Sequence, residues 1–169
     1  RKNRSSCAVL IGGETDAELM ELGNDVFSYF GLGCRNVSKL YIPEEYDLIP
    51  LLRLWEKFVD ITDHNKYANN YNYQRSIHLV NLKHFYDNGA LIMVESDKLV
   101  SPISAVFYER YTDQKDLKQR IAVHQEKLQV VLSAKAWFDG SIDFGKAQKP
   151  EVWDYADNVD TLKFLADLK

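Results

Sequence analysis

The chain has 169 residues, of which 46% are apolar and 27% are charged, and its formal net charge is −4. This composition is typical of one globular domain with an ordinary core, and the negative charge argues against electrostatic binding of nucleic acid. We found no apolar run long enough to span a bilayer and no signal peptide, so we expect a cytoplasmic protein without membrane insertion.

Strand and helix patterns alternate from the start of the chain. The apolar run 6-SCAVLI-11 is followed by two glycines and predicts a buried strand. A capping pattern at residues 15–16 opens an amphipathic helix, which we expect to end at Gly31 or Gly33. The next strand is predicted over residues 37–42.

The middle of the chain continues this alternation. Residues 47–60 predict a second amphipathic helix, and the polar, aromatic segment 63–74 has no clean period. A further helix is expected to pass through residues 77–80. Beyond it, strands are predicted over residues 90–95, 103–111 and 128–133, and a helix over residues 113–126.

The last segment, residues 151–169, combines an irregular acidic and aromatic piece with a short helix around Leu162, Phe164 and Leu165. We expect Trp153 and Tyr155 to be buried against the sheet.

The alternation of strands and helices predicts parallel βαβ units. We therefore expect an α/β fold with a mainly parallel sheet and helices on both faces. The glycines of 31-GLG-33 end a helix instead of opening one, whereas a pyrophosphate binds at a helix N-terminus. The chain therefore shows no dinucleotide site of its own.

Cys34 is the candidate nucleophile. Thiolate is the reactive form of cysteine, and Arg35 places a positive charge beside it, although the carbonyl end of the preceding helix acts in the opposite direction. Gly31 and Gly33 let a substrate approach the backbone, whose amides around Cys34 could hold an oxyanion. A buried structural cysteine in a glycine turn fits the same residues. We do not expect a disulfide with Cys7, the other cysteine.

The four histidines are scattered, with no H-x-x-x-H or C-x-x-C pair, so no metal site is expected. His64 could act as a base, and it also suits a solvated or capping position. The segments 67-YANNYNY-73 and 144-FGKAQKP-150 suit either a pocket or ordinary loops. The candidate pocket residues are Gly31, Gly33, Arg35, Asn36, His64, Asn69, Asn70, Gly145 and Lys146.

Several segments, taken in order, resemble the catalytic domain of the aldehyde dehydrogenase superfamily. They are 14-ETDAEL-19, 31-GLGC-34, 37-VSKLYI-42, 101-SPISAVFYERY-111, 128-LQVVLS-133 and 144-FGKAQ-148. Within that superfamily the chain is similar to the acyl-CoA reductases of the bioluminescence (LuxC) type over nearly its whole length. The segments that carry this likeness are 1-RKNRSS-6, 29-YFGLGCRNVSK-39, 66-KYANNYNY-73, 144-FGKAQ-148 and 153-WDYADNVDTLKFL-165.

The resemblance implies that Cys34 attacks a fatty acyl-CoA, that CoA leaves, and that NADPH reduces the resulting acyl-enzyme to an aldehyde. It also implies that residues 1–169 are a catalytic domain, that the nicotinamide is held by a domain absent from this chain, and that the full-length protein is a homo-oligomer. The sequence departs from the superfamily at Leu32, where hydrolytic members usually carry glutamine, and at Lys98, where a cofactor-contacting glutamate is common.

Two alternatives stay open. One is another reductase of the superfamily that uses an acyl phosphate or a different acyl donor. The other is a noncatalytic fragment that serves in assembly or binding, in which Cys34 is inert.

Overall fold

The computed structural model describes residues 4–155 and 159–168. Its strands are β1 (Ser5–Val9), β2 (Val37–Pro43), β3 (Tyr86–Asp87), β4 (Ile92–Glu95), β5 (Ala105–Tyr111) and β6 (Leu128–Ser133). Its α-helices are α1 (Asp16–Phe27), α2 (Leu48–Leu54), α3 (Asn65–Val80), α4 (Gln114–Val123) and α5 (Thr161–Asp167). The 3-10 helices are η1 (Ser28–Gly31), η2 (Trp55–Asp63), η3 (Gln125–Lys127) and η4 (Ala134–Ala136).

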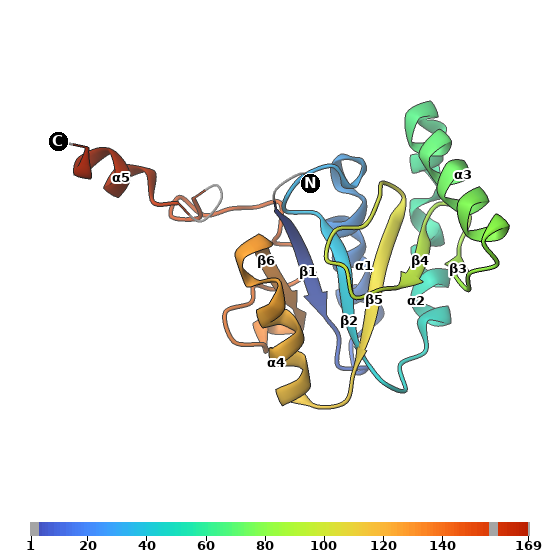
Figure 1. Ribbon diagram of the computed structural model, residues 1–169, viewed down its shortest axis with the longest axis horizontal. Helices are drawn as coiled ribbons and strands as arrows, with labels where there is room; N and C mark the ends of the chain where they lie inside the picture. The colour runs from blue at the N-terminus through green and yellow to red at the C-terminus, as the bar shows by residue number, and fades with distance from the viewer. Residues whose placement is uncertain (1–3, 156–158, 169) are drawn as a thin grey trace.

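The six strands form one sheet in the order β3-β4-β5-β2-β1-β6 (Figure 1). Every neighbouring pair is parallel except β3 with β4. The predicted α/β fold with a mainly parallel sheet is therefore confirmed. The two-residue strand β3 was not predicted, because so short a segment has no period of its own.

Helices cover both faces of the sheet, as the sequence predicts. Alternate residues of β1 point to opposite faces, so that Ala8 belongs to the core beneath α1 and α2, and Cys7 to the core beneath α4. On the first face, Trp55 is fully buried, and its indole N–H donates to the Leu19 carbonyl at 2.9 Å. On the second face, Leu117 of α4 is buried.

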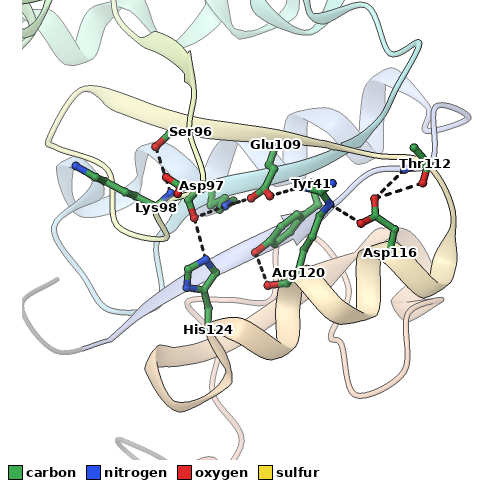
Figure 2. Close-up of polar contacts among 10 residues, drawn as sticks. Tyr41, Ser96, Asp97, Lys98, Glu109, Thr112, Asp116, Arg120 and His124 are labelled. Carbon is green, nitrogen blue, oxygen red and sulfur yellow. Dashed lines mark hydrogen bonds and ion pairs between the residues drawn. The ribbon is translucent and has the colours of Figure 1, made fainter.

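The α4 face also contains an ion-pair network that is buried at Lys39 and partly exposed at its other members. The ammonium of Lys39 on β2 is fully buried and pairs with Glu109 on β5. Figure 2 shows that Glu109 also contacts Arg120 of α4, which in turn pairs with Asp116. The network therefore joins two neighbouring strands to the helix that covers them.

The first helix ends earlier than the sequence predicts. The structure ends α1 at Phe27, four residues before Gly31, and Tyr29 and Phe30 follow with φ of 52° and 57°. The reason is a tertiary contact. The side-chain nitrogen of Asn36 donates to the carbonyls of Asp25 and Ser28, so these carbonyls have a hydrogen-bond partner without a further helical turn.

Two other expectations need correction. The helix expected over residues 47–60 divides into α2 and η2, and the segment 63–74 belongs mostly to α3. Trp153 is 68% exposed, so the expectation that it is buried against the sheet was wrong. The segment that ends in α5 stands away from the sheet and its helices (Figure 1). Of the segments that carry the resemblance, residues 1–3 and 156–158 lie outside the described residues.

Candidate functional site

Cys34 lies between η1 and β2, just before the N-terminal end of this interior strand of the sheet. It is exposed, whereas Cys7 is buried, and both are free thiols. The alternative of a buried structural cysteine at position 34 is therefore excluded. Burial raises the pKa of the Cys7 thiol to about 12, so Cys7 has almost no thiolate at neutral pH.

Asn36 fixes the shape of the loop that carries Cys34. Its side chain is fully buried, and its Oδ1 accepts the N–H of Gly33 at 2.8 Å. Its Nδ2 donates to the carbonyls of Asp25 at 3.0 Å and Ser28 at 2.8 Å. These bonds hold the loop against the end of α1, so Asn36 positions Cys34 without presenting its own amide to solvent.

The two candidate glycines are required by this geometry. Gly31 has φ of 67°, in the left-handed region that favours glycine. A Cβ at Gly33 would lie 2.9 Å from Asn36 Oδ1. The glycines thus permit the tight packing of the loop on Asn36, and the amide of Gly33 is already engaged within the chain.

Two backbone amides beside the thiol remain available. The N–H groups of Cys34 and Arg35 make no hydrogen bond to any other residue in the described ranges. The carbonyl of Cys34, in contrast, accepts the hydroxyl of Ser6 at 3.0 Å, which anchors the residue to β1. Free donors on an anchored backbone are what a tetrahedral oxyanion needs.

Arg35 points from the loop to distant parts of the chain. Its guanidinium donates to the Ala147 carbonyl at 3.1 Å and lies 3.7 Å from the Asp154 carboxylate. Only 15% of its side chain is exposed. The arginine therefore joins the Cys34 loop to residues 144–148 and to the start of the C-terminal tail.

A second contact holds residues 144–148 in place. The carboxylate of Asp25 accepts the N–H groups of Gly145 at 2.6 Å and Ala147 at 3.1 Å. Burial raises the pKa of Asp25 to about 6, against the opposing effect of these hydrogen bonds. Gly145 is buried with φ of 75°, whereas Lys146 is exposed.

The structure also brings the start of α3 to the loop. The ring of His64 lies 4.4 Å from that of Phe30, measured between centroids. A pocket of about 260 Å³ separates the two segments. Its lining is formed by Phe30, Leu32, His64, Lys66, Tyr67, Asn70 and Ile103.

His64 and Asn70 are thus candidates that the structure places beside the loop. Asn69 is exposed on α3 and does not line this pocket. Tyr67 belongs to the segment 67–73, which the sequence offered as either a pocket or an ordinary loop. Sequence reasoning missed Phe30 and Ile103 as pocket residues, and it also missed Asp25. The signal for Asp25 was present, because an acidic residue beside Val26 falls on the apolar side of α1.

A larger cleft of about 630 Å³ lies on the α4 side of the sheet and reaches Arg35 and Asp154. Gln129 lines it and is 7% exposed, and its side-chain oxygen has no hydrogen-bond partner among the residues described. This cleft contains neither Cys34 nor His64 in its lining.

The turn between β1 and α1 does not fit a dinucleotide. A bound pyrophosphate would need the amides that precede the helix. The carboxylate of Glu14 already accepts those of Ile11 at 2.5 Å and Gly12 at 3.0 Å, and it would repel a phosphate. In the described ranges no cluster of three or more His, Cys, Asp or Glu side chains could hold a metal, and no helix is long and apolar enough to cross a membrane.

Comparisons with known proteins concern the fold alone. No family model and no curated protein matches the chain. Aldehyde dehydrogenase 21 from Physcomitrella patens, in complex with succinate, matches with a TM-score of 0.46 and 15% identity over 78% of this chain. The Δ-pyrroline-5-carboxylate dehydrogenase from Mycobacterium tuberculosis, bound with NAD, matches with a TM-score of 0.44 and 13% identity over 95% of it. The chain spans 33% of the length of each.

Proposed function

We propose that this chain is the thioester-forming domain of an NADPH-dependent fatty acyl-CoA reductase of the LuxC type, with Cys34 as the nucleophile. The observation that carries the proposal is the combination at one loop of an exposed thiol and two adjacent free amides, those of Cys34 and Arg35. The sequence resemblance supplies the choice of acyl-CoA as the donor.

The reaction at this loop is an acyl transfer. The sulfur of Cys34 attacks the carbonyl carbon of the thioester, and the free amides stabilise the negative oxygen of the tetrahedral intermediate. The bond from that carbon to the sulfur of CoA then breaks. CoA leaves as a thiolate and takes up the proton lost by Cys34, so the products are the acyl-enzyme and CoA.

Other residues of the site act through position. Asn36 and Ser6 hold the loop, and Asp25 and Arg35 hold residues 144–148 against it. His64 and Leu32 both line the apolar pocket beside the loop. This pocket offers a place for an aliphatic group of the substrate. These contacts make the backbone at Cys34 rigid before a substrate arrives, as an oxyanion site requires.

The nicotinamide belongs to a separate domain in this proposal, because the turn before α1 is filled by Glu14. NADPH would supply the hydride that converts the acyl-enzyme to the aldehyde. This chain alone should accept an acyl group and should not oxidise NADPH steadily in the presence of acyl-CoA.

Intact-mass spectrometry after mixing the chain with octanoyl-CoA tests the proposal. We expect one octanoyl adduct, which disappears in Cys34→Ala and persists in Cys7→Ala. Labelling by an acyl phosphate but not by octanoyl-CoA would favour a different reductase. If neither donor labels Cys34, and its thiol also reacts no faster than a free cysteine peptide, the catalytic assignment fails.

A further inference from the structure

Residues on either side of Cys34 line two different cavities. Phe30 and Leu32, which precede the thiol, line the pocket of about 260 Å³ beside α3. Arg35, which follows it directly, lines the cleft of about 630 Å³ between α4 and β6. A thioester substrate also has two arms that meet at the reacting carbon, the acyl group and the thiol that leaves. The proposed function gives the acyl group to the smaller pocket, so the cleft is the place for the other arm.

The cleft combines an apolar wall with several polar side chains, as ligand-binding cavities commonly do. The apolar wall includes Ile121, Ala122, Leu128 and Phe138. The charged side chains of the lining, two of each sign, are Arg35, Lys118, Asp139 and Asp154. Because these charges balance, the cleft suits a ligand segment that is itself uncharged and has both apolar and polar groups.

Gln129 gives the cleft an unused hydrogen-bond acceptor. It lines the cleft and is 7% exposed, and its side-chain oxygen has no partner among the residues described. Buried polar atoms are nearly always paired, because an acceptor that loses water without gaining a donor lowers the stability. An N–H group of a ligand would supply the missing donor.

We propose that this cleft binds the pantetheine arm of the acyl-CoA, an inference that rests on the proposed acyl transfer at Cys34. Pantetheine is an uncharged chain in which two amide groups alternate with short aliphatic segments. It therefore matches a charge-balanced cleft with an apolar wall and an unused acceptor. One amide N–H of the arm donates to the side-chain oxygen of Gln129, and the aliphatic segments lie along the apolar wall.

The course of α4 gives the bound arm a direction. The strands β5 and β6 run parallel within the sheet, so α4, which connects them, runs the opposite way and ends where β2 and β6 begin (Figure 1). Lys118 lies one turn earlier on α4 than Ala122 and is therefore farther from the loop of Cys34. A chain that enters past Arg35 meets Gln129, the second residue of β6, before it reaches Lys118. The phosphate end of the arm then lies toward a cation that can pair with it.

Calorimetric titration of a Cys34→Ala chain with CoA tests the cleft without any acyl transfer. Ala122 is exposed, so Ala122→Trp should fill the cleft without disturbing the core, and we expect it to weaken binding more than about tenfold. Gln129→Leu removes the acceptor and should weaken binding about five- to tenfold. Val80→Trp, at an exposed position on α3, is the matched control and should bind as its parent does.

The stability of Gln129→Leu gives a second readout. Because the oxygen of Gln129 makes no hydrogen bond within the described part of the chain, this substitution should not lower the free energy of unfolding in urea. A parent chain that does not bind CoA, or cleft variants that bind it as tightly as Val80→Trp does, would overturn the proposal.

Acylation of Cys34 separates this inference from the reaction on which it rests. Ala122→Trp should slow acylation by octanoyl-CoA more than about tenfold and leave the rate with octanoyl-N-acetylcysteamine, which lacks most of the arm, unchanged. If it slows neither donor, the cleft assignment fails and the acyl transfer stands. If neither donor labels the wild-type chain, the acyl transfer fails, and the titration still decides whether the cleft binds CoA. Faster acylation by octanoyl-acyl carrier protein, which has the same arm, would overturn the choice of CoA.

Discussion

The side-chain oxygen of Asn36 accepts the amide of Gly33 at 2.8 Å, and this contact joins the end of α1 to the loop of Cys34. Asn36 is fully buried, and its nitrogen also donates to the carbonyl of Ser28. One side chain therefore satisfies a backbone donor and a backbone acceptor that lie outside the α-helices and strands. The position of the exposed thiol therefore depends on a buried amide two residues away.

Replacing Asn36 should loosen this loop. Asn36→Ala leaves the amide of Gly33 and several carbonyls without a partner, so we expect the free energy of unfolding to fall by about 2–4 kcal/mol. Urea unfolding measures the loss. Asn69→Ala, at an exposed asparagine, is the control and should change stability by less than about 0.5 kcal/mol. Equal effects of the two substitutions would contradict the bracing role of Asn36.

The two cysteines should differ strongly in reactivity. At pH 8 in the native state, iodoacetamide should modify Cys34 and leave Cys7 unmodified, because Cys7 is buried and its pKa is raised to about 12. In urea both should react. Peptide mapping after a timed quench identifies the modified residue, and native labelling of Cys7 at the rate of Cys34 would show that the core opens in this region.

Asp25 should make stability depend on pH between about 4 and 6. Its pKa is about 6 in the folded chain and near 3.9 in an unfolded one, so in this range the folded state holds a proton that the unfolded state has released. Stability from this group is therefore present below about pH 4 and is lost as the pH rises to about 6. A difference of about two pKa units corresponds to about 3 kcal/mol.

Asp25→Asn removes this titration. The difference in unfolding free energy between the wild-type chain and the variant should change between about pH 4 and 6 and stay constant above that range. The charged groups nearest to the carboxylate, Glu21 and Lys149, are the same in both chains. A constant difference from pH 4 to 7 would show that Asp25 does not titrate there.

Substitutions at Glu109 and at Lys39, in the ion-pair network on the α4 face, should lower the stability by different amounts. Glu109→Gln removes the carboxylate that pairs with the fully buried Lys39, and we expect a loss of about 2–3 kcal/mol. Lys39→Met removes the buried charge itself and leaves Glu109 paired with Arg120, so the loss should be below about 1 kcal/mol. Urea unfolding of both chains decides this, and the opposite order would show that the ammonium is stabilised by other groups such as the Asp97 carbonyl, 3.0 Å away.

The sequence by itself determined the class of fold and the identity of the candidate nucleophile. Apolar runs such as 6-SCAVLI-11 and 128-LQVVLS-133 have the local pattern of buried strands, and the helices between them have an apolar side that requires a sheet to pack against. The two glycines before Cys34 also predicted a turn, because glycine is favoured where φ is positive.

Only the tertiary structure decided where α1 ends and what surrounds Cys34. The bonds from Asn36 to the end of α1, from Asp25 to Gly145, and from Arg35 to Ala147 join residues that are roughly ten to more than a hundred positions apart, and local propensity carries no record of such partners. The exposure of Trp153 has the same origin. An aromatic residue is buried only if the path of the chain returns it to the core, and that path is a property of the whole fold.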